Sequence, residues 1–260
     1  MIYKSDGSLC LNTYIMTKFK KITIRAFFIF VILIPVAAFA HFIIFPQETR
    51  SILIDYSGFK KEGRIYFNEH TTSQGKIDSL QSLITEASAR VKGFWGQKIS
   101  TPKFIYCNNE SDFKKYSVNA SAPAVTYLKL GSVIVLSREA MNLDIIAHEI
   151  SHAELYERLG FYKFNYKIPS WFKHGIAMQN DYRNYYSLDT LKVRSDNFKN
   201  LPDIKSFTSD RQFYSGSQEQ IMLNYMTAKY EVENWYTKEK LDKLIEDIKS
   251  GKTFDEAFGK

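Results

Sequence analysis

The sequence predicts an α+β fold with a small mixed sheet and a helical C-terminal lobe, preceded by one N-terminal transmembrane helix. Segments rich in aromatic and β-branched residues alternate with helical segments up to about residue 137, and only helical patterns follow. A stretch without any full charge precedes both regions. The chain has 260 residues, 20 Phe and 17 Tyr, which is enough to bury a sizeable core. Disorder of most of the chain is therefore excluded.

The uncharged stretch, residues 26–45, has the length of a membrane anchor. Its 20 residues span about 30 Å at about 1.5 Å per residue. Five basic residues precede it against the single Asp6: Lys4, Lys18, Lys20, Lys21 and Arg25. Positive charge favours the cytoplasmic side, so we expect residues 1–25 in the cytoplasm and a domain of residues 46–260 on the extracytoplasmic side.

A cleaved signal peptide is the alternative interpretation of the same stretch. Ala38-Phe39-Ala40 has the small-x-small form of a cleavage site, and cleavage would leave a secreted or periplasmic protein. The apolar run continues to Phe45, which favours an uncleaved anchor. Met16 is an alternative start that would shorten the basic segment. Residues 47–51 are expected to form a short link to the domain.

The distribution of charge argues against a nucleic-acid-binding protein, and the positions of the two cysteines argue against a disulfide. The net charge is +7, of which residues 1–25 hold +4 and residues 26–45 none, leaving +3 for residues 46–260. A nucleic-acid-binding domain would concentrate basic residues on its folded part, so we expect no nucleic-acid partner. Cys10 and Cys107 would lie on opposite sides of a membrane, so we expect no disulfide between them.

The first half of the exported domain carries the strand patterns. We predict strands at residues 64–67, 102–107, 125–130 and 132–136. Residues 77–94 have apolar side chains at helical spacing, and residues 111–116 predict a short helix.

The second half is predicted to be helical. Asn142 is the expected N-cap of a helix over residues 143–159, which Gly160 ends, and an aromatic-rich loop follows to Pro169. Ser170 is the expected cap of a helix over residues 171–178. Residues 182–215 predict loops with short helices. The closing helices are predicted at residues 218–235, 238–249 (capped by Thr237) and 254–258.

A metal-binding motif lies inside the helix predicted at residues 143–159. His148-Glu149-Ile150-Ser151-His152 places two imidazoles four residues apart, on one helix face, so that both reach one ion. Neutral imidazole is a good Zn²⁺ ligand. The alternative is a helix with two ordinary surface histidines. The apolar neighbours of the motif oppose that alternative, because burial of His and Glu without partners is costly.

His174 is the candidate third ligand. Three of the five histidines in the chain, His148, His152 and His174, fall in one short window. His174 lies on the next predicted helix, after a connector that allows the chain to fold back. Three protein ligands would leave one coordination position open. The alternative is that His174 is an ordinary surface histidine.

These residues resemble the gluzincin metallopeptidases, particularly the bacterial peptidase MA-like group. In that group an HExxH helix is followed, some twenty residues on, by a segment of the form P-x-W-[LF]-x-E-G-x-A. Six positions match that segment here: Pro169, Trp171, Phe172, Gly175, Ile176 and Ala177. The resemblance covers roughly residues 124–260 and implies a zincin-like fold. His174 stands where the group usually has Glu, which removes one negative charge from the implied site.

The resemblance implies a zinc metallopeptidase acting on a peptide or protein substrate, and the apolar stretch at residues 26–45 would anchor it in a membrane. It assigns Zn²⁺ to His148, His152 and His174, and the role of general base to Glu149. An oxyanion donor is also expected, with Tyr225 first and Tyr230 second. In the family the strand before the active helix is an edge strand that pairs with extended substrate, which implies this role for residues 132–136. The alternative is that these residues form a core strand. A catalytically inactive zincin-fold binding or structural module is the alternative. Oligomeric state is not predicted.

Overall fold

The computed structural model of the protein describes residues 7–259. These residues divide into two compact units, with the boundary between Thr49 and Arg50. Lys4 and Asp6 of the predicted basic segment lie outside the described residues, as does the side chain of Cys10. The expectations that rest on them stay predictions.

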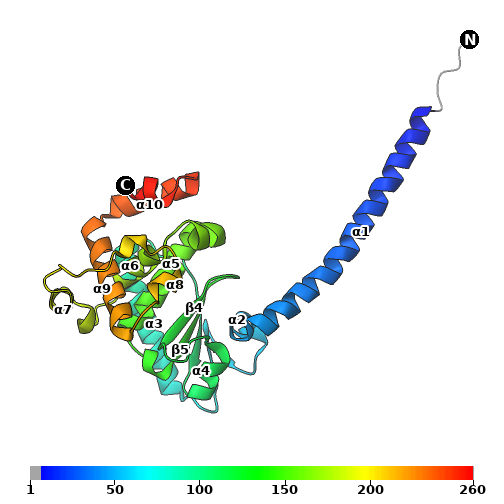
Figure 1. Cartoon of the computed structure of the whole chain (residues 1–260). Helices are drawn as coiled ribbons and strands as arrows, with labels where there is room; N and C mark the ends of the chain where they lie inside the picture. The colour runs from blue at the N-terminus through cyan, green and yellow to red at the C-terminus, as the bar shows by residue number, and fades with distance from the viewer. Residues whose placement is uncertain (1–6, 260) are drawn as a thin grey trace, which may run out of the picture. The chain divides into compact units, whose positions relative to one another are not determined.

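The first unit is dominated by one long helix, α1 (Gly7–Ile44), shown in blue in Figure 1. Its part Thr23–Ile44 is long and apolar enough to cross a membrane, although a signal sequence has the same properties. A second helix, α2 (Pro46–Ile52), follows at once. The short link expected at residues 47–51 is thus helical, and the boundary between the two units lies within it. Helical geometry is supported here by Pro46 at the first position of α2, where a missing N–H costs nothing.

The second unit contains one five-stranded sheet in the order β1-β2-β3-β5-β4. Its strands are β1 (Lys60–Glu62), β2 (Ile65–Phe67), β3 (Lys103–Cys107), β4 (Ala124–Tyr127) and β5 (Val133–Ser137). The strands β2, β3 and β5 run parallel, and antiparallel β1 and β4 form the two edges. The mixed α+β class is confirmed, and β1 is a strand that the sequence analysis did not predict.

The expectation that residues 132–136 form an edge strand is wrong. The strand β5 pairs with β3 on one side and with β4 on the other, so β4 is the edge. The physical reason is visible in the burial of β5, whose residues are all buried. A short strand with apolar residues on both faces belongs inside a covered sheet, not at its margin.

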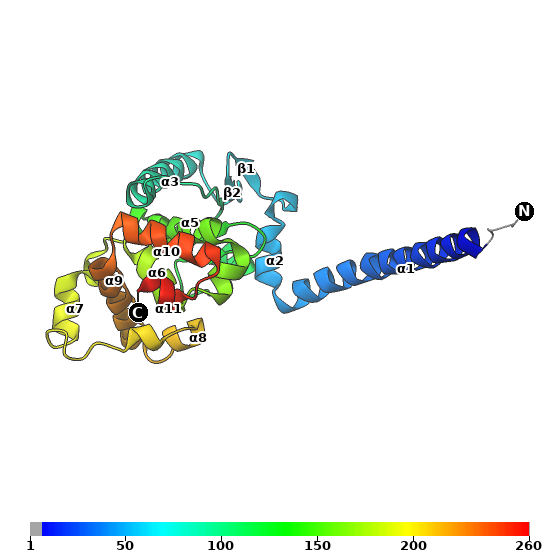
Figure 2. The same cartoon turned by 90° about the horizontal axis from the view of Figure 1, so that it is seen from above.

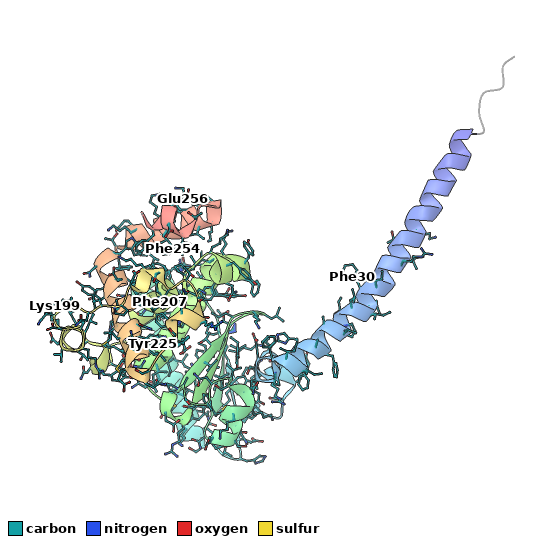
Figure 3. All side chains as sticks on the ribbon, viewed as in Figure 1. Phe30, Lys199, Phe207, Tyr225, Phe254 and Glu256 are labelled. Atoms are coloured by element: carbon teal, nitrogen blue, oxygen red, sulfur yellow. The ribbon has the colours of Figure 1, made fainter. Side chains whose placement is uncertain are left out.

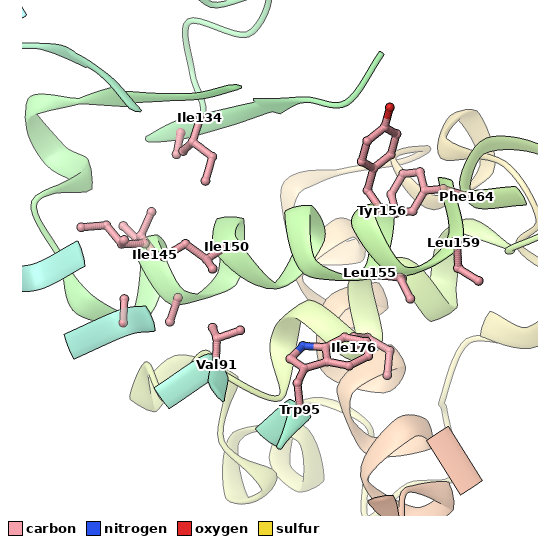
Figure 4. Close-up of a cluster of buried hydrophobic side chains, with 14 of the residues drawn as sticks. Val91, Trp95, Ile134, Ile145, Ile150, Leu155, Tyr156, Leu159, Phe164 and Ile176 are labelled. Atoms are coloured by element: carbon pink, nitrogen blue, oxygen red, sulfur yellow. The ribbon is translucent and has the colours of Figure 1, made fainter. Parts of the chain in front are cut away.

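Helices cover both faces of the sheet. Side chains that alternate along β5 divide between two cores. Ile134 and Leu136 contact the core of α3 (Gln74–Trp95) and α5 (Leu143–Tyr166), whereas Val133 and Val135 pack with α4 (Glu110–Tyr116). Figure 4 shows Ile134 above α5 and Val91 of α3 below it. In Figure 2 the long α3 lies beside β1 and β2.

The helix that carries the HExxH motif, α5 (Leu143–Tyr166), begins as predicted and ends later. The side chain of Asn142 accepts hydrogen bonds from the backbone N–H groups of Asp144 (2.9 Å) and Ile145 (3.2 Å). Gly160 breaks the helix with φ 75° and ψ 165°, and a last helical segment then runs to Tyr166. The loop predicted there is therefore largely helical.

The remaining chain forms the helical lobe, with α6 (Ser170–Met178), α7 (Leu188–Arg194), α8 (Asp210–Phe213), α9 (Gln218–Trp235), α10 (Lys238–Ser250) and α11 (Phe254–Phe258). The N-cap of α6 is Pro169, so the assignment of the cap to Ser170 is wrong. Ser170 is the first helical residue, and its hydroxyl bonds Asp210 at the start of α8 instead.

Candidate metal centre

Three histidines from α5 and α6 converge on one point. His148 and His152 are one helical turn apart, and their Nε2 atoms are 3.2 Å from each other. His174 comes from α6, and its ring centroid is 5.1 Å from that of His152. One ligand atom from each of the three residues lies within 4.8 Å of the others. This spacing allows one metal ion to contact all three imidazoles.

The protonation of these imidazoles also fits a metal. Burial lowers the pKa of His152 to about 4 and holds the pKa values of His148 and His174 well below 6.5. All three rings are therefore neutral at pH 7, with lone pairs available. The Nδ1 atoms of His148 and His174 are buried without a hydrogen-bond partner among the described residues. Such a cluster is costly by itself, and a bound cation offsets part of that cost.

Glu149 lies beside the histidine cluster, half-buried on the same helix. The hydroxyl of Thr126 on β4 donates a hydrogen bond to Oε2 of Glu149. Burial raises the pKa of Glu149 to about 7, while the Thr126 hydrogen bond opposes that rise. A carboxyl group with a pKa near neutrality accepts and returns a proton readily at physiological pH.

Two tyrosines complete the wall next to His174. Tyr225 on α9, labelled in Figure 3, has its ring centroid 5.2 Å from that of His174. The hydroxyl of Tyr214 is 2.9 Å from that of Tyr225 and 3.2 Å from Nε2 of His174. Tyr230 lies elsewhere, stacked on Phe198 at 5.0 Å and lining a different cavity. Of the two tyrosines named from sequence, Tyr225 lies at the cluster and Tyr230 does not.

A buried carboxylate stands behind His148. Asp181 is fully buried, and its Oδ2 is 3.7 Å from Nδ1 of His148. Nε of Arg183 donates to Oδ1 of Asp181 at 2.8 Å, which holds the carboxylate in place. The distance is longer than a hydrogen bond, but the carboxylate stands beside the second nitrogen of His148, where the partners that orient ligating histidines lie.

A cavity of about 440 Å³ opens onto the cluster. Its polar lining includes His148, Glu149 and Tyr225, and its apolar lining includes Ile145 and Met222. A second cavity of about 690 Å³ shares its rim at residues 121–123 and extends to Cys107 at the end of β3. The two cavities therefore adjoin each other, and the smaller one also reaches Ala124, the first residue of the edge strand β4.

No family model matches the chain, and neither the curated proteins nor the solved structures include a detectable relative. The resemblance to gluzincins therefore rests on the motif residues alone.

Three residues of this site were missed from sequence. Thr126 lies on a predicted strand, but strand patterns do not say which side chain meets Glu149. Asp181 and Tyr214 lie in or next to residues 182–215, where apolar periodicity is weak. The only signal for Asp181 is its position three residues after α6, close to the end of the segment that carries His174.

Proposed function

We propose that this chain is a zinc-dependent metallopeptidase of the gluzincin type with a zincin-like fold. One observation carries the proposal: the ligand atoms of His148, His152 and His174 lie within 4.8 Å of one another, and Glu149, the neighbour of His148, lines the same cavity as that histidine. Three imidazoles match the donor set of known catalytic zinc sites. A purely structural zinc site would close the fourth position and would not need Glu149.

His148, His152 and His174 would hold the metal. Bound Zn²⁺ supplies Lewis-acid chemistry, because it acidifies water and polarises a carbonyl. The carboxylate of Glu149 accepts a proton from the attacking water and returns it to the nitrogen of the leaving amine. Thr126 keeps that carboxylate aimed into the cavity. Tyr225 faces the same space and donates a hydrogen bond to the developing oxyanion.

The proposed substrate is a peptide or protein segment in extended conformation. The edge strand β4 borders the cavity and ends the sheet, and an edge strand pairs with an added strand through its main chain. The shared rim of the two cavities at residues 121–123 continues this path toward Cys107. Such a groove holds several substrate residues on one side of the scissile bond.

The proposed location is the extracytoplasmic side of a membrane, with α1 as an uncleaved anchor. The support comes from the apolar segment Thr23–Ile44 and from the basic residues before it. Signal-peptide cleavage would give a secreted or periplasmic enzyme instead. Mass spectrometry of the N-terminus of the membrane-bound protein distinguishes the two.

Metal content is the first test. We expect about one zinc per chain in purified protein, and a sharp loss of zinc in the His174→Ala variant. Glu149→Gln should keep the zinc and abolish cleavage of a peptide library, because the amide cannot accept the proton. Wild-type protein that binds no zinc even after addition, or turnover that survives Glu149→Gln, contradicts the proposal.

An inactive binding module on the same fold is the second candidate. It is favoured by His174, since the matching position is usually an anionic Glu in the gluzincin group. His174→Glu separates the two candidates when it is measured beside wild type. An active wild type identifies the three-histidine site as functional. Activity that arises only in His174→Glu identifies the natural chain as a metal-binding module without turnover.

A further inference from the structure

The phenol oxygen of Tyr214 lies close to one ligand atom of the candidate metal centre. It is 3.2 Å from Nε2 of His174. Two ligand atoms of one tetrahedral zinc ion, each about 2.0–2.1 Å from the metal, are about 3.3–3.4 Å apart. The Nε2 atoms of His148 and His152, 3.2 Å apart, have nearly this separation. The oxygen of Tyr214 has the same relation to His174.

The charge of the site favours an additional anionic ligand. Three neutral imidazoles leave both positive charges of a divalent ion without compensation by the ligands. Three carboxylates lie nearby, and each has another partner. Asp210 accepts a hydrogen bond from Ser170. Asp181 is paired with Arg183 behind His148, and Glu149 accepts the hydrogen bond from Thr126. Burial raises the pKa of the Tyr214 phenol, so a phenolate would form only through its bond to the metal ion, where it would supply the negative charge that His174 does not.

We propose that Tyr214 is a fourth, exchangeable ligand of the metal ion, bound as a phenolate while no substrate is present. The inference rests on the proposed metal centre. When the ligand binds, the O–H bond of Tyr214 breaks, an oxygen–metal bond forms, and the proton leaves to solvent. When water or substrate takes the position, the oxygen is protonated again and withdraws. The resting enzyme thus covers its own metal.

The location of Tyr214 allows this exchange. It follows directly after α8 (Asp210–Phe213), a helix of four residues, and 45% of its surface is exposed. Gly216, two residues later, has φ +98°, so the chain turns sharply just after the tyrosine. Movement of Tyr214 would break its ring contacts with His174 and Tyr225 but would unfold no long helix.

Tyr225 has a different part in this arrangement. It lies within the 18-residue α9 and packs against the core, so its position is fixed. Its hydroxyl is 2.9 Å from that of Tyr214. It therefore donates a hydrogen bond to the phenolate oxygen while Tyr214 is bound, and stabilises the charge there. After Tyr214 withdraws, the same O–H group is available for an oxyanion.

Copper gives a direct readout of phenolate ligation. The full chain in detergent is stripped with a chelator and reloaded with Cu²⁺, which binds nitrogen and oxygen sites more tightly than other first-row divalent ions. We expect one copper per chain and a visible phenolate-to-copper charge-transfer band. Tyr214→Phe should lose the band and keep the copper. Tyr225→Phe and Tyr185→Phe, the latter outside the cavity lining, should keep both. Zinc affinity, measured by competition with a chromophoric chelator, should fall roughly tenfold or more in Tyr214→Phe, a loss that even outer-shell partners produce.

Other outcomes overturn the inference in distinguishable ways. Stoichiometric copper without the band in wild type, or a band that persists in Tyr214→Phe, removes Tyr214 as a ligand and leaves the metal centre intact. A band that is lost only in Tyr225→Phe assigns the ligand to Tyr225 and also overturns the inference. Absence of bound copper and zinc in the wild-type chain overturns the metal centre itself.

Discussion

The hydroxyl of Thr126 on the edge strand β4 donates a hydrogen bond to Oε2 of Glu149 on α5. The contact ties the carboxylate of the motif to the strand that borders the cavity. It also favours the charged form of Glu149, against a burial effect that favours the neutral form. The proposed base is thus held near neutrality by two opposing influences from different elements.

Removal of this hydroxyl should shift the pH dependence of activity. In Thr126→Val the influence that lowers the pKa of Glu149 is lost, so that pKa rises, by about one to two units if the hydrogen bond is worth about 1.5–3 kcal/mol. Bound metal lowers the pKa in both proteins, so the difference remains. Because the base must be deprotonated, the acid limb of kcat/KM should move to higher pH. Thr126→Ser, which keeps a hydroxyl, should stay close to wild type; an unmoved limb in Thr126→Val would contradict the assignment.

Metal-free protein should lose stability as the pH falls below about 6.5. There the unfolded chain protonates its histidines, while burial keeps His148, His152 and His174 neutral in the folded chain, so the unfolded state binds more protons. His152 alone, with a pKa of about 4, accounts for roughly 3 kcal/mol. Glu149 acts in the opposite direction, because its raised pKa lets the folded state take up a proton between about pH 7 and pH 4.5. Because three histidines act against one carboxyl group, the free energy of unfolding should fall overall as the pH falls.

Urea unfolding at several pH values measures this dependence. Glu149→Gln removes the opposing contribution and should make the loss steeper. His70→Gln changes an exposed histidine outside the cluster and should leave the slope unchanged. A free energy of unfolding that is flat or rises from pH 7 to pH 4 in the metal-free protein would show that the cluster is not buried as described.

Asp181 should contribute to metal affinity without touching the metal. Its carboxylate faces Nδ1 of His148 at 3.7 Å, and Asp181→Asn removes the charge at nearly constant volume. We expect zinc to bind about 10–100-fold more weakly, the usual effect of such partners. Asp189→Asn, at an exposed position of α7, is the matched control. Arg183→Gln removes the ion pair with Asp181 but keeps the carboxylate. An equal loss of zinc affinity in that variant would show that the ion pair, and not the carboxylate, explains the weaker binding.

The main elements could be predicted because their patterns are local. The apolar spacing of α3 and the Asn142 cap of α5 are visible over a few turns, and both are confirmed. The strand β1 was not predictable in this way, because Lys60–Glu62 is entirely polar and is defined only by its pairing with β2. The edge position of β4 likewise depends on the order of strands, which is a long-range property.

The candidate site divides in the same manner. His148, Glu149 and His152 could be named because a single helix positions them, and His174 because a short segment follows. Tyr214 could not be named from the sequence. Its place beside His174 depends on the stacking of Phe213 on that histidine, with ring centroids 4.4 Å apart, and the two residues are 39 positions apart in the chain. The zinc, the peptidase activity and the membrane topology stay predictions.

Gly175, next to His174, should be intolerant of any side chain. A Cβ atom there would lie 2.6 Å from the carbonyl oxygen of Ala228 and 2.6 Å from Cγ2 of Val232, because α6 and α9 approach each other at this point. Gly175→Ala should therefore destabilise the protein by about 1–3 kcal/mol and weaken zinc binding, as α6 shifts together with His174. Gly93→Ala in α3 is the matched control: its Cβ meets nothing within 4 Å, so it should stabilise the helix by about 0.5–1 kcal/mol. Thermal unfolding and zinc titration measure the stability and the zinc affinity of both variants. Equal stability and equal zinc affinity in the two would contradict the close packing of α6 on α9 that holds His174 in place.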